Sequence, residues 1–482
     1  MRVLYEKGAP GRRAVRLPPF DGPTEPAIPS ALRRETPAAL PELSELEVVR
    51  HFTGLSHRNF SIDTHPYPLG SCTMKYNPRA CEQAAALEGF AELHPLWPQL
   101  RHGSPLTQGA LEVLYETGRL LCEITGMAEF TLQPLAGAHG EFTAARIMAA
   151  YHADRGSKRT HILIPDSAHG TNPASARLAG YDVVTVPSDT GGVMDFDRFR
   201  AALTPETAGV MLTCPNTLGL FNPRIREIAD AIHAVDGLFY YDGANLNALL
   251  GRCKPGAMGF DLCHLNLHKT FATPHGGGGP GAGPVGVVER LRPYLPVSRV
   301  RKAPDGTFHL HYDEPRSIGY VAPFYGNFAV IVRAFAYLQM LGREGLRETS
   351  DMAVLAANVV QERLRAAYEA VTPGRCMHEC VFSARRQAAK GARALDLAKA
   401  LIDRGLHPPT VYFPLNVPEA LMIEPTETEA PESLTLLTDA LLELAALAER
   451  DPDALRRAPE TTPVGRLDEV AAAREMNLVW PD

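Results

Sequence analysis

Lys269 lies in a part of the chain that suits a chemically reactive amine. It follows a short, mostly apolar run, 262–267, and precedes the glycine-rich loop 274–281. An amine held in a desolvated pocket has its charged form disfavoured, so it can act as a nucleophile and form a Schiff base with a carbonyl group. The alternative is a surface lysine beside a flexible loop. This segment alone favours neither interpretation.

Asp242 shifts the balance towards a catalytic role for the lysine. It ends the apolar run 238–241 and is followed by Gly243. A carboxylate at the C-terminal end of a strand can keep a pyridinium nitrogen protonated, and a protonated ring of that kind is a strong electron sink. A helix N-cap is the simpler role for such an aspartate, and alone it would be preferred. The combination with Lys269 favours a cofactor with a pyridine ring.

Three further segments could complete such a site. The glycine-rich turn 136–141 opens a predicted helix, so its backbone N–H groups and the helix dipole would favour a phosphate. His169 follows a predicted strand, and its imidazole could lie flat against an aromatic ring, although a lone histidine is more often an ordinary polar residue. Asn216 and Thr217 follow another predicted strand and could donate a hydrogen bond to a ring oxygen.

The elements that would position these residues alternate along the chain between residues 105 and 340. Short apolar runs are separated by helical stretches, which is typical of crossover units and a mainly parallel sheet. In such sheets, ligands bind beyond the carboxyl ends of the strands, where these candidate residues fall. The predicted strands are 161–164, 182–186, 209–214 and 238–241, and the predicted helices include 106–124, 141–152, 196–203 and 225–235.

The pattern changes near residue 340, where a long amphipathic helix begins. Strand-like pieces and a leucine-rich helix follow it, and together they predict a smaller α/β domain. These elements are expected at 343–371, 380–383, 411–415, 420–423 and 432–450.

The first 60 residues or so are rich in proline and are predicted to form an extended arm with short helices such as 42–52. The sequence therefore predicts three parts: an N-terminal arm and extension (1–95), a large domain (96–340) and a small C-terminal domain (341–482).

Composition argues against several classes of function. The net charge of −7 argues against nucleic-acid binding, because phosphate binding needs a basic excess. No stretch approaches the ~18 uninterrupted apolar residues of a membrane span, and no signal peptide is expected. Eight scattered cysteines in 482 residues indicate a reduced, cytoplasmic protein. Residues 376–380 superficially resemble a metal cluster, but no second ligand pair is near in sequence, so no metal is expected.

The order of these features along the chain resembles a known superfamily. A glycine turn, a histidine, an asparagine, an aspartate and a lysine, each at the end of a successive element, resemble the fold-type-I pyridoxal-phosphate enzymes, the aspartate aminotransferase superfamily. Four segments are more specific and resemble the glycine cleavage system P-protein, or glycine decarboxylase. They are LYEKGAPGRR (4–13), THPYPLGSCTMKYNP (64–78), AHGTNPAS (168–175) and NLHKTF (266–271). The length is similar to that of subunit 2 of the two-subunit form.

The resemblance implies a role for each candidate residue. Lys269 would hold pyridoxal 5'-phosphate covalently, Asp242 would hold the ring nitrogen and His169 would stack on the ring. Residues that flank the lysine or offer backbone N–H groups would help to hold the phosphate. The cofactor-binding residues implied are Ala138, His139, His169, Asn216, Thr217, Asp242, His268, Lys269 and Thr270. The segment 64–77 would line the mouth of the site, with Ser71, Cys72 and Thr73 on the substrate side.

The activity that the resemblance implies is decarboxylation of glycine, with transfer of the aminomethyl group to the lipoyl group of a carrier, the H-protein. It also implies a partner, subunit 1, in a dimer of heterodimers. One alternative is another fold-type-I activity, an aminotransferase or a cysteine desulfurase, which would use the same lysine, aspartate and histidine. The other is a non-catalytic partner subunit, against which the presence of both Lys269 and Asp242 argues.

Overall fold

The computed structural model describes residues 2–19, 21–22, 28–36, 38–94, 105–323, 326–372 and 374–479. The chain divides into two compact units, 1–65 and 66–482. The first unit holds two 3-10 helices and one α-helix, namely η1 (Leu4–Glu6), η2 (Ser30–Leu32) and α1 (Glu45–Ser56).

Helix α1 begins later than the predicted helix 42–52 because Ser44 caps it. The Ser44 hydroxyl accepts the N–H of Glu47, and the Glu47 carboxylate accepts the N–H of Ser44 at 2.9 Å. This reciprocal capping box satisfies two N–H groups that would otherwise lack partners, so it fixes the first turn at Glu45.

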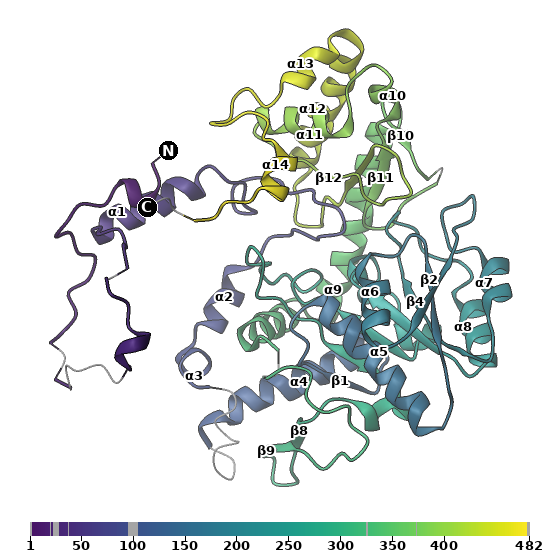
Figure 1. Cartoon of the computed structure of the whole chain (residues 1–482). Coiled ribbons are helices and arrows are strands. Elements are labelled where there is room, and N and C mark those ends of the chain that lie inside the picture. Colours follow the sequence, from purple (N-terminus) through teal and green to yellow (C-terminus); the bar gives the residue numbers. More distant parts are fainter. Residues whose placement is uncertain are drawn as a thin grey trace. The chain divides into compact units, whose positions relative to one another are not determined.

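The second unit is built around a seven-stranded sheet (Figure 1), with strand order β1-β7-β6-β5-β4-β2-β3. Strands β2 to β6 run parallel, while β7 is antiparallel to β6 and to β1. The prediction of a mainly parallel sheet is therefore confirmed. The strands are β1 (Glu129–Thr131), β2 (His161–Pro165), β3 (Asp182–Val186), β4 (Thr207–Thr213), β5 (Leu238–Gly243), β6 (Leu262–Leu265) and β7 (Val285–Val287).

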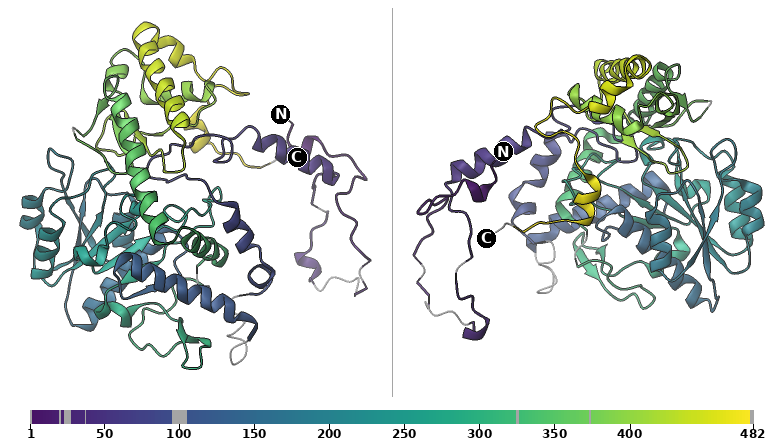
Figure 2. Two further views of the ribbon diagram at one scale, coloured as in Figure 1. Left: turned by 180° about the vertical axis from the view of Figure 1, so that it is seen from behind. Right: turned by 45° about the horizontal axis from the view of Figure 1, so that its top comes forward.

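Helices cover both faces of this sheet (Figures 1 and 2). On β5, Tyr241 packs into the core that includes α4 and α8, whereas the adjacent Tyr240 packs into the opposite core with α5. Successive residues of a strand point to opposite faces, so both faces are buried as a parallel sheet requires. The helices are η4 (Pro105–Thr107), α4 (Gln108–Thr125), α5 (Gly137–Asp154), α6 (Thr171–Leu178), α7 (Phe196–Ala202), α8 (Ile225–Ala234), η5 (Leu246–Ala248), η6 (Pro255–Met258) and η7 (Glu289–Tyr294).

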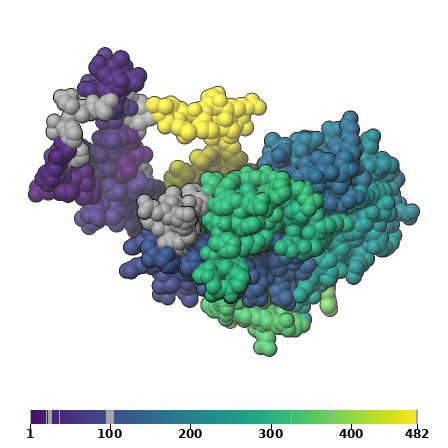
Figure 3. Space-filling view, turned by 90° about the horizontal axis from the view of Figure 1, so that it is seen from below, coloured from purple at the N-terminus to yellow at the C-terminus, as the bar shows by residue number. Residues whose placement is uncertain are grey.

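A hairpin and a long helix follow the large sheet. The hairpin strands β8 (Arg299–Lys302) and β9 (Phe308–His311) belong to the green segment in front in Figure 3. Helix α9 (Phe328–Leu364) is interrupted at Gly342, where φ is 59° and ψ is −170°. Its second half matches the start of the predicted helix 343–371 but ends seven residues earlier, because the chain enters strand β10 at Glu369.

A smaller sheet of four antiparallel strands follows, in the order β10-β11-β13-β12. The predicted strand 411–415 is too long: pairing ends at Val411, because Tyr412 takes a left-handed conformation with φ of 57°. The remaining elements are β10 (Glu369–Ala370), β11 (Cys380–Ser383), α10 (Arg385–Ala388), α11 (Ala394–Asp403), β12 (Thr410–Val411), β13 (Ala420–Ile423), α12 (Pro431–Arg450), α13 (Pro452–Arg457) and α14 (Glu469–Arg474).

An extended segment, residues 66–77, runs along this smaller sheet and is called the strap below. Leu69 bridges Ile423 of β13, and the Thr410 hydroxyl donates to the Gly70 carbonyl at 2.8 Å. A side chain at Gly70 would overlap Met422, so only glycine lets the strap approach β13 this closely. The strap leads into α2 (Arg79–Ala85) and α3 (Glu88–Ala91). None of the helices in the described part of the chain has the length and apolar character that crossing a membrane needs.

Candidate active site

A cavity of about 210 Å³ lies beyond the C-terminal ends of the parallel strands, where the sequence predicted a ligand site. Its wall combines residues from β4, β5, the segment after β6, the start of α5 and the strap. The lining residues are Ser71, Gly137, Ala138, Glu141, His169, Thr171, Thr213, Thr217, Asp242, Ala244, Asn245, Asn266, His268 and Lys269. The structure thus brings together seven of the predicted site residues: Ser71, Ala138, His169, Thr217, Asp242, His268 and Lys269.

Five predicted residues do not line this cavity. The Asn216 amide holds its own loop together, donating to the Gly192 carbonyl and accepting the N–H groups of Leu218 and Leu220. His139 faces the start of its helix, where its Nδ1 accepts the N–H of Leu135 at 3.2 Å. Thr73 donates its hydroxyl to Glu424 instead. The other two are Cys72, half-buried in the strap, and Thr270, whose buried hydroxyl has no partner.

Lys269 sits in a turn just past β6, and its Nζ donates to the Ser71 carbonyl at 2.7 Å. It is the one lysine or arginine among the residues lining the cavity. Burial, and then the charge of Lys269, lowers the pKa of His268 to about 3 and that of the nearby His275 to about 4. These imidazoles are therefore neutral near pH 7, and Lys269 carries the positive charge of the site.

Asp242 is the ionised acid of the site. It is 2% exposed, and it accepts hydrogen bonds from Asn172 Nδ2 at 2.8 Å, from Thr213 Oγ1 at 3.1 Å and from the Ala244 N–H at 3.0 Å. Burial opposes ionisation, but the imidazole of His264 at 3.6 Å and these donors hold the pKa of the carboxyl below its usual value. Sequence reasoning missed Asn172 and Thr213, which lie far from Asp242 in the chain.

Glu141 is a second carboxyl in the wall, and it behaves in the opposite way. Burial, followed by the charge of Asp242, raises its pKa to about 8, so it is protonated near neutral pH. The Thr171 hydroxyl donates to its Oε1 at 2.8 Å, while Oε2 has no partner. Near the mouth, His169 Nδ1 lies 2.9 Å from the same hydroxyl, and desolvation with the charge of Lys269 lowers the pKa of the ring.

The start of α5 forms a cradle with the properties of an anion site. The helix begins at Gly137, four residues before the predicted start, and no side chain caps its first N–H groups. A Cβ on Gly137 would lie 2.6 Å from Asn266 Oδ1, and one on Gly283 would overlap the Ala136 carbonyl oxygen. Close backbone packing therefore requires these glycines. Uncapped N–H groups at the positive end of an 18-residue helix can bind a phosphate.

Comparisons with known proteins agree with this arrangement. The family model described as glycine cleavage system P-protein matches residues 19–305, and the model described as glycine dehydrogenase, C-terminal domain, matches residues 349–455. A protein of Caldanaerobacter subterraneus subsp. tengcongensis named probable glycine dehydrogenase (decarboxylating) subunit 2 is 51% identical, over 99% of this chain and 98% of its own. One of the same name from Exiguobacterium sibiricum is 53% identical, over 98% and 96%.

Solved structures support the fold. A glycine decarboxylase (P-protein) of the glycine cleavage system, in an inhibitor-bound form, aligns with a TM-score of 0.71 at 22% identity, over 87% of this chain and 93% of its own. The aspartate aminotransferase of Thermus thermophilus aligns with a TM-score of 0.57 at 15% identity, over 79% and 98%. These likenesses confirm the predicted aspartate aminotransferase-like fold. From its sequence relatives, the chain belongs to the glycine cleavage system P-protein family, alongside the proteins named subunit 2.

Proposed function

We propose that this chain binds pyridoxal 5'-phosphate in the cavity, decarboxylates glycine and passes the aminomethyl group to the lipoyl group of the H-protein. The observation that carries the proposal is that Lys269 and the ionised Asp242 line one cavity beside the uncapped start of α5. The names of the relatives supply glycine as the substrate and decarboxylation as the reaction. The name subunit 2 of the relatives supports a partner subunit. We further propose that the partner is subunit 1, in a dimer of heterodimers, and that the protein is cytoplasmic.

The residues present fit the cofactor. The glycine-dependent cradle and the unpartnered N–H groups at the start of α5, including that of Ala138, suit its phosphate. Asp242 suits a protonated ring nitrogen, and His169 is available to the ring face. Lys269 would hold the cofactor covalently. Thr217 lies in the wall but already donates its hydroxyl to Ser167 at 2.7 Å, so we assign it a supporting role.

Bound pyridoxal phosphate supplies an electron sink for the negative charge that remains on the substrate carbon when CO2 leaves. The chain's own residues control protons and orientation. Asp242 keeps a proton on the ring nitrogen, because its carboxylate is held ionised by three donors. Lys269 Nζ donates to a neutral acceptor, the Ser71 carbonyl, and is the group of the chain that would carry a proton to or from the substrate. Glu141, protonated near neutral pH, adds no negative charge beside Asp242.

The test compares purified wild-type protein with Lys269→Ala and with a matched control, Lys254→Ala, whose side chain lies at the surface beside Glu123. We expect the wild type and the control to show the visible absorbance of the bound cofactor, and Lys269→Ala to lack it. With subunit 1 and lipoylated H-protein added, the wild type and the control should exchange labelled bicarbonate into the carboxyl group of glycine.

Two outcomes would contradict the proposal in different ways. Cofactor absorbance without exchange, even with subunit 1 and the carrier present, would favour the aminotransferase and cysteine desulfurase alternatives, for which keto acid and alanine formation are the direct assays. No cofactor absorbance at all would favour a non-catalytic partner subunit.

A further inference from the structure

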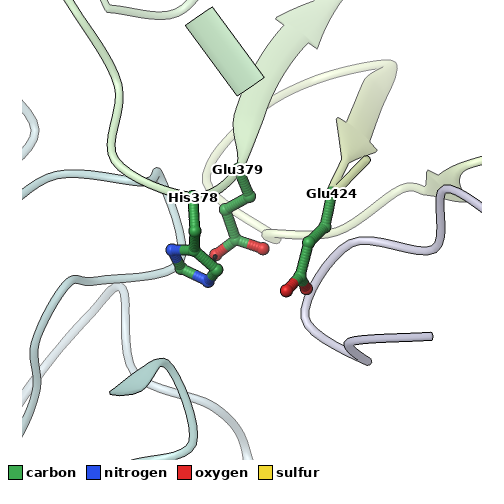
Figure 4. A group of neighbouring side chains, drawn as sticks. All are labelled: His378, Glu379 and Glu424. Carbon is green, nitrogen blue, oxygen red and sulfur yellow. Dashed lines mark ion pairs between the residues drawn. The ribbon is translucent and has the colours of Figure 1, made fainter. Parts of the chain in front are cut away.

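Three ionisable side chains form a buried cluster beside the site and have no part in the function proposed above. His378 and Glu379 lie just before β11, and Glu424 follows β13; Figure 4 shows the three side chains converging. The first two are 0% exposed and Glu424 is 1% exposed. One carboxyl oxygen or ring nitrogen of each lies within 4.8 Å of those of the others. We call Glu379 and Glu424 the carboxyl pair.

The strap joins the carboxyl pair to Lys269. The Ser71 carbonyl accepts Lys269 Nζ at 2.7 Å, while the Ser71 N–H donates to Glu379 Oε2 at 2.9 Å. Ser71 has a φ of 64°, a left-handed conformation that non-glycine residues adopt rarely. Two residues on, the Thr73 hydroxyl donates to Glu424 Oε1 at 2.6 Å. The two acids therefore hold the strap through groups that Lys269 does not use.

Hydrogen-bond donors, not a cation, satisfy most of the carboxyl oxygens. Besides the strap, Asn245 Nδ2 lies 3.4 Å from Glu379 Oε1 and Asn247 Nδ2 lies 3.1 Å from Glu424 Oε1. Among the described residues, Glu424 Oε2 and both ring nitrogens of His378 have no hydrogen-bond partner, although His378 Nε2 lies 3.8 Å from Glu379 Oε1. A divalent cation would compete with the donors and would meet the positive charge of Lys269. A single proton held by one of the two acids faces neither obstacle.

The electrostatic environment of the pair also favours a retained proton. Two carboxylates this close in a buried site cannot both ionise cheaply, so one proton is retained. Burial, then the charge of Glu424, raises the pKa of Glu379 above its usual value, and burial raises the pKa of Glu424 to about 7. His378 adds no charge, because burial and then Lys269 lower its pKa to about 3.

The remaining ionisable groups near the pair do not supply a counter-charge. Lys75 Nζ lies 2.6 Å from Glu427 Oε1, so these two neighbours of Glu424 form an ion pair and affect its pKa in opposite directions. The other neighbour that affects Glu379 is the Cys376 thiol. Among the described residues near the pair, Lys269 is therefore the cation that the pair's single negative charge balances.

We propose that Glu379 and Glu424 share one proton and that their single negative charge is the counter-charge of Lys269. The hydrogen bonds of Ser71 in the strap link the pair to this amine. These residues position and charge-balance the amine; they do not touch the substrate. The negative charge of the pair interacts favourably with Lys269, and it would act in the same way on the linkage of Lys269 to the cofactor. The second statement rests on the cofactor role proposed for Lys269, whereas the shared proton does not.

A shared proton predicts a non-additive response to Glu379→Gln and Glu424→Gln. Either single substitution removes the repulsion from the neighbouring carboxyl, so the remaining carboxyl ionises more readily than before, against the opposing effect of burial, and the cluster keeps one negative charge. Only the double variant loses the charge. Because an opposite charge nearby changes a pKa by about 1–3 units, the double variant should lower the midpoint pH of the cofactor's visible absorbance change by about 1–3. Each single variant should keep the wild-type midpoint.

A second measurement needs no cofactor. Infrared spectra of the cofactor-free protein in H2O and D2O should contain, besides the signal of protonated Glu141, an exchange-sensitive carboxylic acid signal that both single variants lack. Glu419→Gln is the matched control, because Glu419 precedes β13 as Glu424 follows it and accepts the Ala394 N–H. This control should match the wild type in both measurements. If the wild type binds no cofactor, the proposed function fails while the infrared result still decides the shared proton.

Four results would overturn the inference. Single variants whose midpoint changes add up to that of the double variant would mean that both acids are ionised. A double variant with the wild-type midpoint would mean that neither is. Single variants that keep every carboxylic acid signal of the wild type would place the proton elsewhere. Stoichiometric binding of Mn²⁺ or Ca²⁺ by wild-type protein, detected by calorimetry and lost in the double variant, would make the cluster a cation site. If the double variant does not fold, the infrared spectra of the single variants decide.

Discussion

Asp242→Asn tests the electronic role of the buried aspartate with almost no change in shape. The carboxylate lies at the end of β5 and accepts three hydrogen bonds, two of them on Oδ2 from Asn172 and Thr213. An asparagine amide can accept through only one of its two terminal atoms. At least one buried donor therefore loses its acceptor, which costs about 1–3 kcal/mol of folding free energy.

The larger effect is expected on the cofactor. An opposite charge within hydrogen-bonding range stabilises a protonated ring nitrogen by about 1–3 pKa units. Removing that charge lowers the protonated fraction about ten- to a thousandfold, and each tenfold loss corresponds to ~1.4 kcal/mol. We expect the bicarbonate exchange rate to fall by about a hundredfold, the middle of that range, while the cofactor remains bound through Lys269.

Asp261→Asn is the matched control. Asp261 is also buried, at 4% exposure, but it precedes β6 and therefore lies at the opposite end of the parallel strands from Asp242. It accepts the N–H of Phe239 and side-chain donors of His233 and Arg290. Urea unfolding should show comparable losses of stability for the two variants, and only Asp242→Asn should lose exchange. An Asp242→Asn protein that exchanges bicarbonate at the rate of the control would refute the assignment of Asp242 to the ring nitrogen.

Three further predictions concern the cradle and the buried charges. Gly283→Ala would force a Cβ into the Ala136 carbonyl, so the cofactor Kd from absorbance titration should rise about tenfold or more, equivalent to ~1.4 kcal/mol; an unchanged Kd would mean that the cradle does not bind the phosphate. Glu141→Gln should gain stability over the wild type as pH rises from about 5 to 8, because the folded-state pKa of about 8 lies above the ordinary 4.5 and the wild type must give up a proton on unfolding; denaturation at several pH values checks this, and a constant difference contradicts it. Lys75→Met should cost about 3–5 kcal/mol by leaving Glu427 buried and unpaired, and Lys75→Met/Glu427→Gln should recover most of that loss in chemical denaturation.

The sequence predicted the part of the site that strand ends determine. Lys269 and Asp242 each follow an apolar run that becomes a buried parallel strand, and a ligand site beyond such strands is a general property of the fold. The short chain between the two runs makes them neighbours in the sheet. Both residues could therefore be placed at one cavity without any structure.

Residues that act through tertiary contacts could not be predicted in this way. Asn216 has the right type and position along the chain, but its amide is used within its own loop. The sequence predicted that this helix starts at Glu141, whereas it starts at Gly137. The buried position of Glu141 in the second turn was therefore not predicted. Glu424 carries no local signal, and Glu379 belongs to the segment 376–380, whose resemblance to a metal cluster did not predict the contact with Glu424.

The strap lies within the sequence signature 64–78 and contacts the smaller sheet, so it connects both to one site. Gly70 is required because a side chain would overlap Met422 of β13, and that contact fixes the register of the strap on the smaller sheet. The register then decides that Ser71 presents its N–H to Glu379 and its carbonyl to Lys269. A displacement of β13 therefore moves the acceptor of the reactive amine, although no residue of β13 lines the cavity. The smaller sheet is in this sense part of the proposed site.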